Sequence, residues 1–180
     1  MNIMIVGCGK IGTTILESLV EEGHNVTAVD NDPAVLAEVT NIHDVIGVCG
    51  NGADCSTLEE AGVDKAELFV AATGSDEVNM LSCFLAGRMG ARHTIARIRK
   101  PEYNDRSLGF MKQQLGLSMA INPEQLAAHE LYHILKLPSA AKVETFSRRN
   151  FEMIELRLKA GSPLLGVPLT ELRSRYAAKF

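Results

Sequence analysis

The sequence lacks a long apolar run, paired cysteines and an excess of positive charge. No apolar run approaches the roughly 18 residues that span a membrane. Met1 leads straight into an apolar segment, without a basic leader or a cleavage site. We therefore expect a protein that stays in the cytosol. Its net charge of −4 and pI near 5.7 argue against a nucleic-acid surface, which needs clustered positive charge.

The four cysteines contain no C-x-x-C pair. Reduced cysteines of cytosolic proteins commonly lie in or beside core elements, and we expect this of Cys8, Cys49, Cys55 and Cys83. The sequence therefore predicts neither a disulfide nor a zinc site from them. The 180 residues, 46% hydrophobic and 22% charged, suffice for one ordinary globular domain and part of another.

The N-terminal segment contains the most informative motif. An apolar run over residues 1–6 opens into Gly7-x-Gly9-x-x-Gly12, followed by an amphipathic helical pattern. Gly7 would turn the chain tightly, Gly9 would let a pyrophosphate approach the backbone, and Gly12 would let helix and strand pack without an intervening Cβ. The phosphate would lie at a helix N-terminus, where unpaired N–H groups and the helix dipole stabilise negative charge. The candidate binding residues here are Gly7, Cys8, Gly9, Lys10, Ile11 and Gly12.

A carboxylate follows at the expected distance. Residues 25–30 form a second apolar run that ends in Asp30, 18 residues beyond Gly12. Asp30 can accept hydrogen bonds from a ribose diol. The next residues, Asn31 and Asp32, supply no cation, and the carboxylates would repel a 2′-phosphate. The sequence therefore favours NAD over NADP and adds Asp30 and Asn31 to the candidate site.

Each of these features also has a purely structural interpretation. The glycines could serve packing alone, although the joint presence of strand, helix and acid makes this the weaker interpretation. Asp30 could cap the helix that starts at Pro33. Cys8 lies where a helix N-terminus would stabilise a thiolate. We prefer the simpler interpretation, that Cys8 is a small residue that fits a tight turn.

Short apolar runs alternate with segments of helical period along the rest of the chain. Runs that are apolar throughout indicate strands buried on both faces, and helical connections imply right-handed crossovers into a parallel sheet. We therefore predict a Rossmann-type, doubly wound α/β domain with six strands. Its later strands cover residues 45–49, 68–72, 94–98 and 119–121, and its helices lie near residues 11–22, 33–41, 55–61, 76–90, 105–115 and 123–136.

Ligands of such sheets bind beyond the carboxyl ends of the strands. After the third strand, Asn51 could reach the adenine or ribose, and Asp54 could cap the next helix. After the fourth strand, Thr73 and Gly74 offer hydroxyl and backbone partners to a cofactor.

Polar residues after the fourth strand and at the end of the fifth strand could each contact either a ligand or other groups of the chain itself. Asp76 is predicted to cap the following helix, and for both Ser75 and Asp76 a role in N-capping and a contact with the ligand are about equally supported. Arg97, at the end of the fifth strand, could pair with the phosphates, whereas Arg99 or Lys100 could face solvent.

Together, these strand-end motifs resemble the KTN/RCK (TrkA N-terminal) domain family. The resemblance covers residues 1 to about 136 and is closest to TrkA-type regulatory subunits of bacterial Trk potassium uptake systems. It implies a regulator that binds NAD(H), or in some members ATP or ADP, and performs no catalysis. It also implies a homo-oligomer, a dimer building to a tetramer or ring, whose shape changes reach a TrkH- or TrkG-type membrane subunit at the cytosolic face of the inner membrane.

The C-terminal part has a different pattern. Residues 151–158 alternate like a half-buried strand, with no second strand predicted beside them. We divide the chain into a nucleotide-binding domain (1–122), a crossover helix and linker (123–140), and the beginning of a family-type C-terminal lobe (141–180). We expect either a fragment of a longer protein or a strand that pairs with a second copy. The apolar face of helix 123–136 would serve a dimer.

The same helix contains a metal-like motif. His129 and His133 form H-E-x-x-H, which on a helix places two imidazoles on one face, as zinc proteases require. The short downstream extension with a third ligand is missing. We therefore predict no catalytic residue and no metal site here.

A second motif suggests the alternative function. Tyr132-x-x-x-Lys136, with Ser118 upstream, resembles the catalytic set of short-chain dehydrogenases. That family has a different glycine spacing, and no substrate lobe would position a hydride acceptor here. An NAD-dependent oxidoreductase is nevertheless the second candidate function.

Overall fold

A computed structural model describes residues 1–103, 105–136, 140–146, 151–168 and 170–171. The chain divides into two compact units, Met1–Gln125 and Leu126–Phe180. The predicted boundaries at residues 122 and 140 remain predictions. No helix in the described ranges is both long and apolar enough to cross a membrane.

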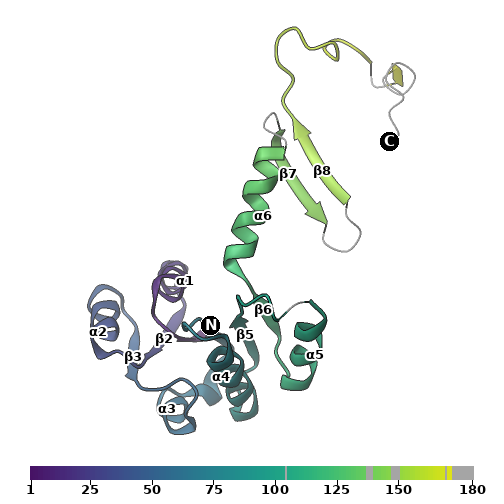
Figure 1. Cartoon of the computed structure of the whole chain (residues 1–180). Helices are drawn as coiled ribbons and strands as arrows, with labels where there is room; N and C mark the ends of the chain where they lie inside the picture. Colours follow the sequence, from purple (N-terminus) through teal and green to yellow (C-terminus); the bar gives the residue numbers. More distant parts are fainter. Residues whose placement is uncertain (104, 137–139, 147–150, 169, 172–180) are drawn as a thin grey trace. The chain divides into compact units, whose positions relative to one another are not determined.

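The first unit contains one six-stranded sheet in the order β3-β2-β1-β4-β5-β6 (Figure 1). Every neighbouring pair in it is parallel. This order, with β1 and β4 adjacent at its centre, confirms the predicted Rossmann-type, doubly wound fold. The strands are β1 (Asn2–Val6), β2 (Asn25–Asp30), β3 (Ile46–Cys49), β4 (Leu68–Ala71), β5 (His93–Arg97) and β6 (Met119–Ile121).

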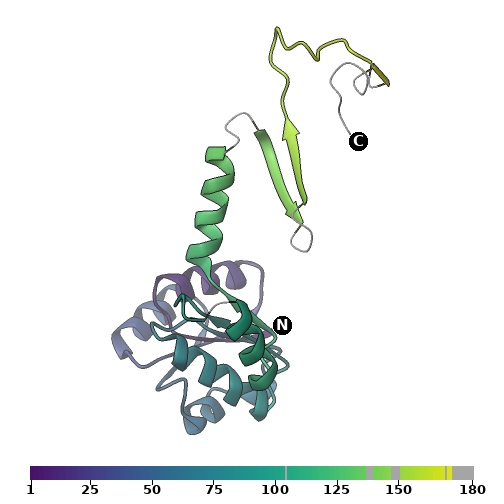
Figure 2. The same ribbon diagram turned by 45° about the vertical axis from the view of Figure 1, so that its right-hand side comes forward.

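Helices cover both faces of this sheet (Figures 1 and 2). Because side chains alternate along a strand, Ile3 and Ile5 pack with the cluster that includes α1 and α2, whereas Met4 and Val6 pack with the cluster of α3, α4 and α5. The central strand is therefore buried on both sides, as predicted. The helices are α1 (Lys10–Glu21), α2 (Pro33–Ile42), α3 (Cys55–Glu60), α4 (Asp76–Met89) and α5 (Asp105–Leu115), with a 3₁₀ turn, η1, at Val63–Lys65.

The edge strand β3 departs from the prediction of complete burial. Only Val48 is buried there, and the side chain of Ile46 is 67% exposed. Apolar composition alone does not distinguish an edge strand from a central one, because both can be rich in valine and isoleucine.

Side-chain caps fix where three of the helices begin. Asp32 caps α2 by accepting from the Ala34 N–H (2.9 Å), ahead of a proline at the first helical position. Asp54 caps α3, as predicted. Ser75 caps α4 (3.3 Å to the Val78 N–H), so the prediction that Asp76 caps this helix is wrong.

The second unit contains a strand that the sequence pattern missed. β7 (Ala140–Phe146) pairs antiparallel with β8 (Phe151–Leu156), so the expectation of a single unpaired strand is wrong. The helix α6 (Pro123–Lys136) crosses the boundary between the units. The predicted linker at 137–139 and the end of the predicted lobe at 172–180 lie outside the described residues.

The H-E-x-x-H motif lies on α6, as predicted. His129 makes an edge-to-face contact with Tyr132, with ring centroids 6.4 Å apart. The side chain of His133 lies outside the described residues. Within the described ranges, no three His, Cys, Asp or Glu side chains gather where they could hold a metal ion.

Candidate functional site

A cleft of about 810 Å³ lies beyond the carboxyl ends of β1 to β5. This volume is in the range of small-molecule sites. Of the twelve candidate binding residues, the structure places ten along it and leaves out Cys8 and Gly12. The ten are Gly7, Gly9, Lys10, Ile11, Asp30, Asn31, Asn51, Thr73, Gly74 and Arg97.

The three motif glycines have distinct environments. Gly7 has φ +93°, and a Cβ there would lie 2.7 Å from the Thr73 nitrogen. A Cβ on Gly12 would lie 1.8 Å from the Gly7 oxygen. The predicted tight turn and close helix–strand packing are therefore present. At Gly9, a Cβ would meet no described atom within 4 Å, so this residue leaves open space beside the cleft.

The start of α1 differs from those of α2, α3 and α4, which are capped by Asp32, Asp54 and Ser75. Its N-cap is Gly9, and no side chain in the described ranges caps it. The first N–H groups of a helix have no partner within the helix. At α1 these groups and the positive end of the helix dipole remain available to an anion in the cleft.

Asp30 is held in position by two backbone N–H groups. Its Oδ2 accepts from the Cys8 N–H (2.7 Å) and its Oδ1 accepts from the Asp32 N–H (2.9 Å). A carboxylate has about four acceptor positions. Asp30 therefore orients the glycine loop and retains acceptors for two ribose hydroxyls. It does not cap α2, because Asp32 does.

The cysteines match the prediction only in part. Cys8 and Cys83 are buried, whereas Cys49 and Cys55 are exposed. Burial, and in second place the Asp30 carboxylate, raise the pKa of Cys8 to about 12. The suggestion of a stabilised thiolate at this helix start is thus wrong, and Cys8 acts as a small buried residue.

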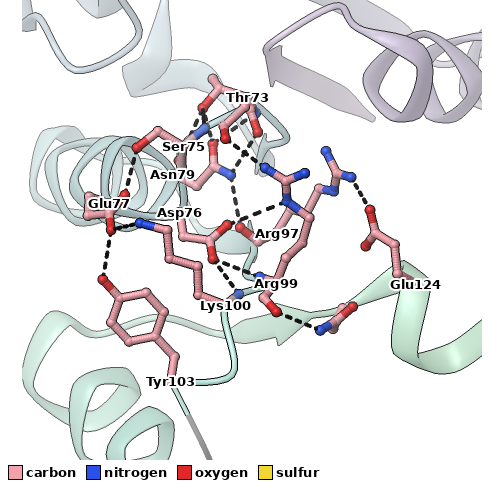
Figure 3. A network of polar contacts seen from close by, with 12 residues as sticks. Thr73, Ser75, Asp76, Glu77, Asn79, Arg97, Arg99, Lys100, Tyr103 and Glu124 are labelled. Carbon is pink, nitrogen blue, oxygen red and sulfur yellow. Dashed lines mark hydrogen bonds and ion pairs between the residues drawn. The ribbon is translucent and has the colours of Figure 1, made fainter.

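Asn79 joins the ends of β4 and β5 (Figure 3). It is fully buried on α4. Its Oδ1 accepts from the Thr73 N–H (2.8 Å) and hydroxyl (2.6 Å), and its Nδ2 donates to the Arg97 carbonyl (2.8 Å). Both strand ends line the cleft, so Asn79 fixes one wall of it from behind.

Asp76, which the sequence suggested as a cap or ligand contact, is buried behind the same wall (1% exposed). Its Oδ2 accepts from the N–H groups of Arg99 and Lys100, both at 2.8 Å. The Arg99 side chain lies 3.8 Å from Asp76 Oδ1 and donates to the Gly74 carbonyl (2.6 Å). Arg99 is therefore tied to the cleft wall, although it was predicted as a possible solvent-facing residue.

Glu77 is the centre of an exposed polar cluster next to this wall (Figure 3). It accepts from the Ser75 hydroxyl (2.8 Å), the Tyr103 hydroxyl (3.1 Å) and the Lys100 ammonium. The Lys100 hydrogen bond is the main cause that lowers the pKa of Glu77 to about 2. The expectation that Lys100 could face solvent therefore holds in part: its side chain is partly exposed, and its ammonium is paired with the Glu77 carboxylate.

Arg97 lies at the cleft, as predicted, and its guanidinium contacts a carboxylate. Its side chain lines the cavity and forms an ion pair with Glu124 on the first turn of α6. Arg97 Nε is buried and has no hydrogen-bond partner among the described residues. The guanidinium therefore retains donor capacity toward an anion.

Residues 3–123 match the sequence profile of the TrkA-N domain family. This match covers more than half of the chain. The chain belongs to the TrkA-N domain family. The predicted resemblance to the KTN/RCK family is thereby confirmed.

Several longer proteins are similar in sequence to this TrkA-N chain. The "Trk system potassium uptake protein TrkA homolog" of Archaeoglobus fulgidus is 37% identical over 96% of this chain and 39% of its own length. The homologue of Methanothermobacter thermautotrophicus is 34% identical over 89% of this chain and 72% of its own length. TrkA of Haemophilus influenzae is 33% identical over 96% of this chain and 38% of its own length. The chain thus spans about two fifths of the first and third of these relatives.

Solved structures confirm the TrkA-N fold. The TrkA-N domain of the inner membrane protein ybaL from Escherichia coli has a TM-score of 0.65 at 17% identity, over 74% of this chain and 96% of that one. The GsuK RCK domain has a TM-score of 0.63 at 21% identity, over 78% of this chain and 29% of that one.

The sequence prediction missed part of the lining of the cleft in this TrkA-N domain. Most of these residues are direct neighbours of predicted ones, and the valines among them make the cleft partly apolar. Position relative to the strand ends was the signal that could have found them. They are Val6, Val29, Asp32, Val35, Gly50, Gly52, Ala72 and Val78. Ser75, which the sequence suggested as a cap or ligand contact, both caps α4 and lines the cleft.

Proposed function

We propose that this TrkA-N chain is an NAD(H)-binding regulatory part of a potassium uptake system and performs no chemistry on its ligand. The observation that carries the proposal is the start of α1, which no side chain in the described ranges caps and which lines a cleft together with Asp30. A diphosphate would bind at the helix start, with Gly7, Gly9, Lys10, Ile11 and Arg97 around it. Asp30 and Asn31 would contact a ribose, and Asn51, Thr73 and Gly74 would complete the site.

Related proteins support a nucleotide ligand. Solved structures with the same fold include a GsuK channel bound to NAD, GsuK bound to ADP, and a Shewanella denitrificans Kef C-terminal domain bound to AMP. These ligands share an adenosine phosphate. NAD is preferred over NADP because Asp30 and Asp32 would repel a 2′-phosphate, and ATP or ADP is the alternative ligand.

The regulatory role is supported by the relatives named as Trk potassium uptake proteins. We propose that the chain acts as a homo-oligomer, a dimer building to a tetramer or ring, beside a TrkH- or TrkG-type membrane subunit. It would then lie at the cytosolic face of the inner membrane. Exposed apolar side chains on α6, among them Leu126 (63% exposed) and Leu135 (77% exposed), offer a contact surface for a second copy.

The mechanism is a difference in affinity between two arrangements of the oligomer. A nucleotide that binds one arrangement more tightly shifts the population toward it, and the shift can only be as large as that difference in affinity. The ligand therefore acts without being consumed.

The position of Ser118 argues against the alternative function, an NAD-dependent oxidoreductase, for which the sequence suggested Ser118 as a catalytic residue. The Ser118 hydroxyl accepts from the Thr94 N–H (3.1 Å) near the amino end of β5. The cleft lies at the opposite, carboxyl edge. Ser118 therefore cannot act on a ligand in the cleft.

A calorimetric competition with NAD, NADH, NADP, ATP and ADP tests the proposal. We expect NAD or NADH to bind most tightly and NADP to bind weakly. Asp30→Ala should weaken NAD binding by about 1–3 kcal/mol, through loss of a charged acceptor. Asp54→Ala is the matched control, since it also removes a carboxylate that accepts backbone N–H groups but does not line the cleft. Unchanged NAD affinity in Asp30→Ala, or steady NADH turnover with carbonyl substrates, would overturn the proposal.

A further inference from the structure

Arg97 links the cleft to the helix that leads into the second unit. It is the last residue of β5, and its side chain is 12% exposed. Its guanidinium points to Glu124, one residue after the start of α6 (Figure 3). Glu124 itself is half exposed, at 52%. One partner of this ion pair thus lines the cleft, and the other belongs to α6.

The start of α6 is attached to the end of β5 by a second contact. Asn122 caps the helix by accepting from the Gln125 N–H (3.0 Å), and its Nδ2 donates to the Arg99 carbonyl (3.4 Å). This second contact involves a backbone carbonyl and an amide, which carry no net charge. A bound phosphate would therefore compete with the Arg97–Glu124 pair and leave the Asn122 contact in place.

The charges around the cleft make that competition direct. Arg97 and Lys10 are the cationic side chains among its lining residues, and Asp30 and Asp32 are the acidic ones. Glu124 neutralises Arg97, so the cleft offers an anion less positive charge than its lining residues suggest. Glu124 accepts from Nη2 of the Arg97 guanidinium. A phosphate that binds this guanidinium through two parallel N–H groups, one of them on Nη2, competes with Glu124 for that nitrogen.

We propose that Glu124 is an internal competitor of the nucleotide phosphates for Arg97, so that a phosphate bound to Arg97 releases the first turn of α6. This inference rests on the proposed nucleotide site and adds a regulatory role to it. Glu124 determines how strongly the cleft attracts phosphate. The exchange of partners at Arg97 converts ligand binding into a change at the start of α6.

A double-mutant cycle measured by calorimetry with ADP tests the inference on the whole 180-residue chain. Glu124→Gln should tighten ADP binding by about fivefold or more, because the ligand no longer displaces a carboxylate. Arg97→Gln should weaken it. Adding Glu124→Gln to Arg97→Gln should then leave the ADP affinity unchanged, because the guanidinium for which Glu124 and the phosphate compete is absent. Glu130→Gln removes an exposed carboxylate from the same helix and should leave ADP affinity unchanged.

Hydrogen exchange supplies the second measurement. Saturation with ADP should speed exchange in the peptide 122–128 of the wild type and should not do so in Arg97→Gln. If Arg97→Gln unfolds, Arg97→Lys replaces it, because it keeps the charge but loses the planar donor fork.

The outcomes separate the inference from the proposed function. If the wild type binds ADP or NAD but Glu124→Gln leaves ADP binding unchanged or weaker, the competition is wrong and the nucleotide site stands. The same conclusion follows if Glu124→Gln has an equal effect with and without Arg97. If the wild type binds neither nucleotide, the proposed function is wrong, and the inference with it.

Discussion

The wall that β1 and β2 contribute to the cleft contains a glycine turn and the start of α1, whereas buried side chains hold the wall from β4 and β5. On the first side, glycines shape the turn, and the helix start has no side-chain cap in the described ranges. On the second side, Asn79 and Asp76 accept or donate several hydrogen bonds from behind the strand ends. Both walls line the cleft, and the second wall also holds the hydrogen bonds that join its strand ends to α4.

The difference has a physical cause. A diphosphate can be bound by main-chain N–H groups, which need close approach and therefore small residues. Polar groups at strand ends that lie against a buried helix are instead stabilised by hydrogen bonds from buried side chains. The glycine turn is therefore sensitive to added atoms at Gly7 and Gly12, and the second wall is sensitive to the loss of the hydrogen bonds of Asn79 and Asp76.

Adding one carbon at Gly12, which packs against the glycine turn behind the first wall, should have the largest effect. In Gly12→Ala the new Cβ would lie 1.8 Å from the Gly7 oxygen, so backbone must move. We expect a loss of about 3 kcal/mol or more of unfolding free energy, at the upper end of overpacking costs. Denaturant unfolding measures it. Gly9→Ala is the control and should keep its stability, since its Cβ meets no described atom within 4 Å. Equal stability of the two variants would contradict the assigned roles.

Removing hydrogen bonds from the second wall should have the next largest effect. Asn79→Ala would leave the Thr73 N–H and the Arg97 carbonyl without their side-chain partner, which costs about 1–3 kcal/mol per buried group. Thermal unfolding checks this loss. Ser82→Ala on the same helix provides the comparison, because that buried hydroxyl has no hydrogen-bond partner among the described residues. Ser82→Ala should be neutral or slightly stabilising, and a loss as large as that of Asn79→Ala would refute the distinction.

Acid should lower the free energy of unfolding through protonation of Glu77, next to the second wall. The folded-state pKa of this carboxyl is about 2, below its ordinary value, chiefly through the hydrogen bond from Lys100. Its contribution to stability is therefore complete above about pH 4.5 and is lost as the pH falls toward 2. Unfolding followed between pH 5 and 2 should show a shallower acid slope in Glu77→Gln and in Lys100→Gln than in the wild type. Parallel slopes in all three proteins would exclude this role.

The smallest effect concerns the difference in reactivity between the buried and the exposed cysteine thiols. Burial raises the pKa values of Cys8 and Cys83 to about 12, whereas Cys49 and Cys55 are exposed. A thiol reagent at pH 8 should therefore modify the latter two in the native protein and all four only after denaturation. Peptide mapping identifies the modified residues. Rapid native modification of Cys8 would show that the glycine loop opens more than its packing indicates.

Much of the first wall could be predicted from local sequence. The strand, the turn glycines, the acid at the end of β2 and the Asp54 cap each depend on neighbouring residues, and the structure confirms their positions. The remaining question for these residues is the ligand itself, which stays a prediction.

Most of the second wall could not be predicted in this way. Asp76 looked like a helix cap because it follows a serine at a helix start, but its carboxylate accepts from Arg99 and Lys100, more than twenty residues away. The ion pair of Arg97 with Glu124 spans a similar distance. Such contacts depend on which strand ends become neighbours, and no local periodicity encodes that. β7 was missed because its composition shows no clear alternation.

The double attachment of Asn79 has a mechanical consequence. Because one amide joins the tip of β4 to the tip of β5, neither tip can shift without straining a hydrogen bond to the other. A displacement of either strand end would therefore act on the other end and on α4, which carries Asn79.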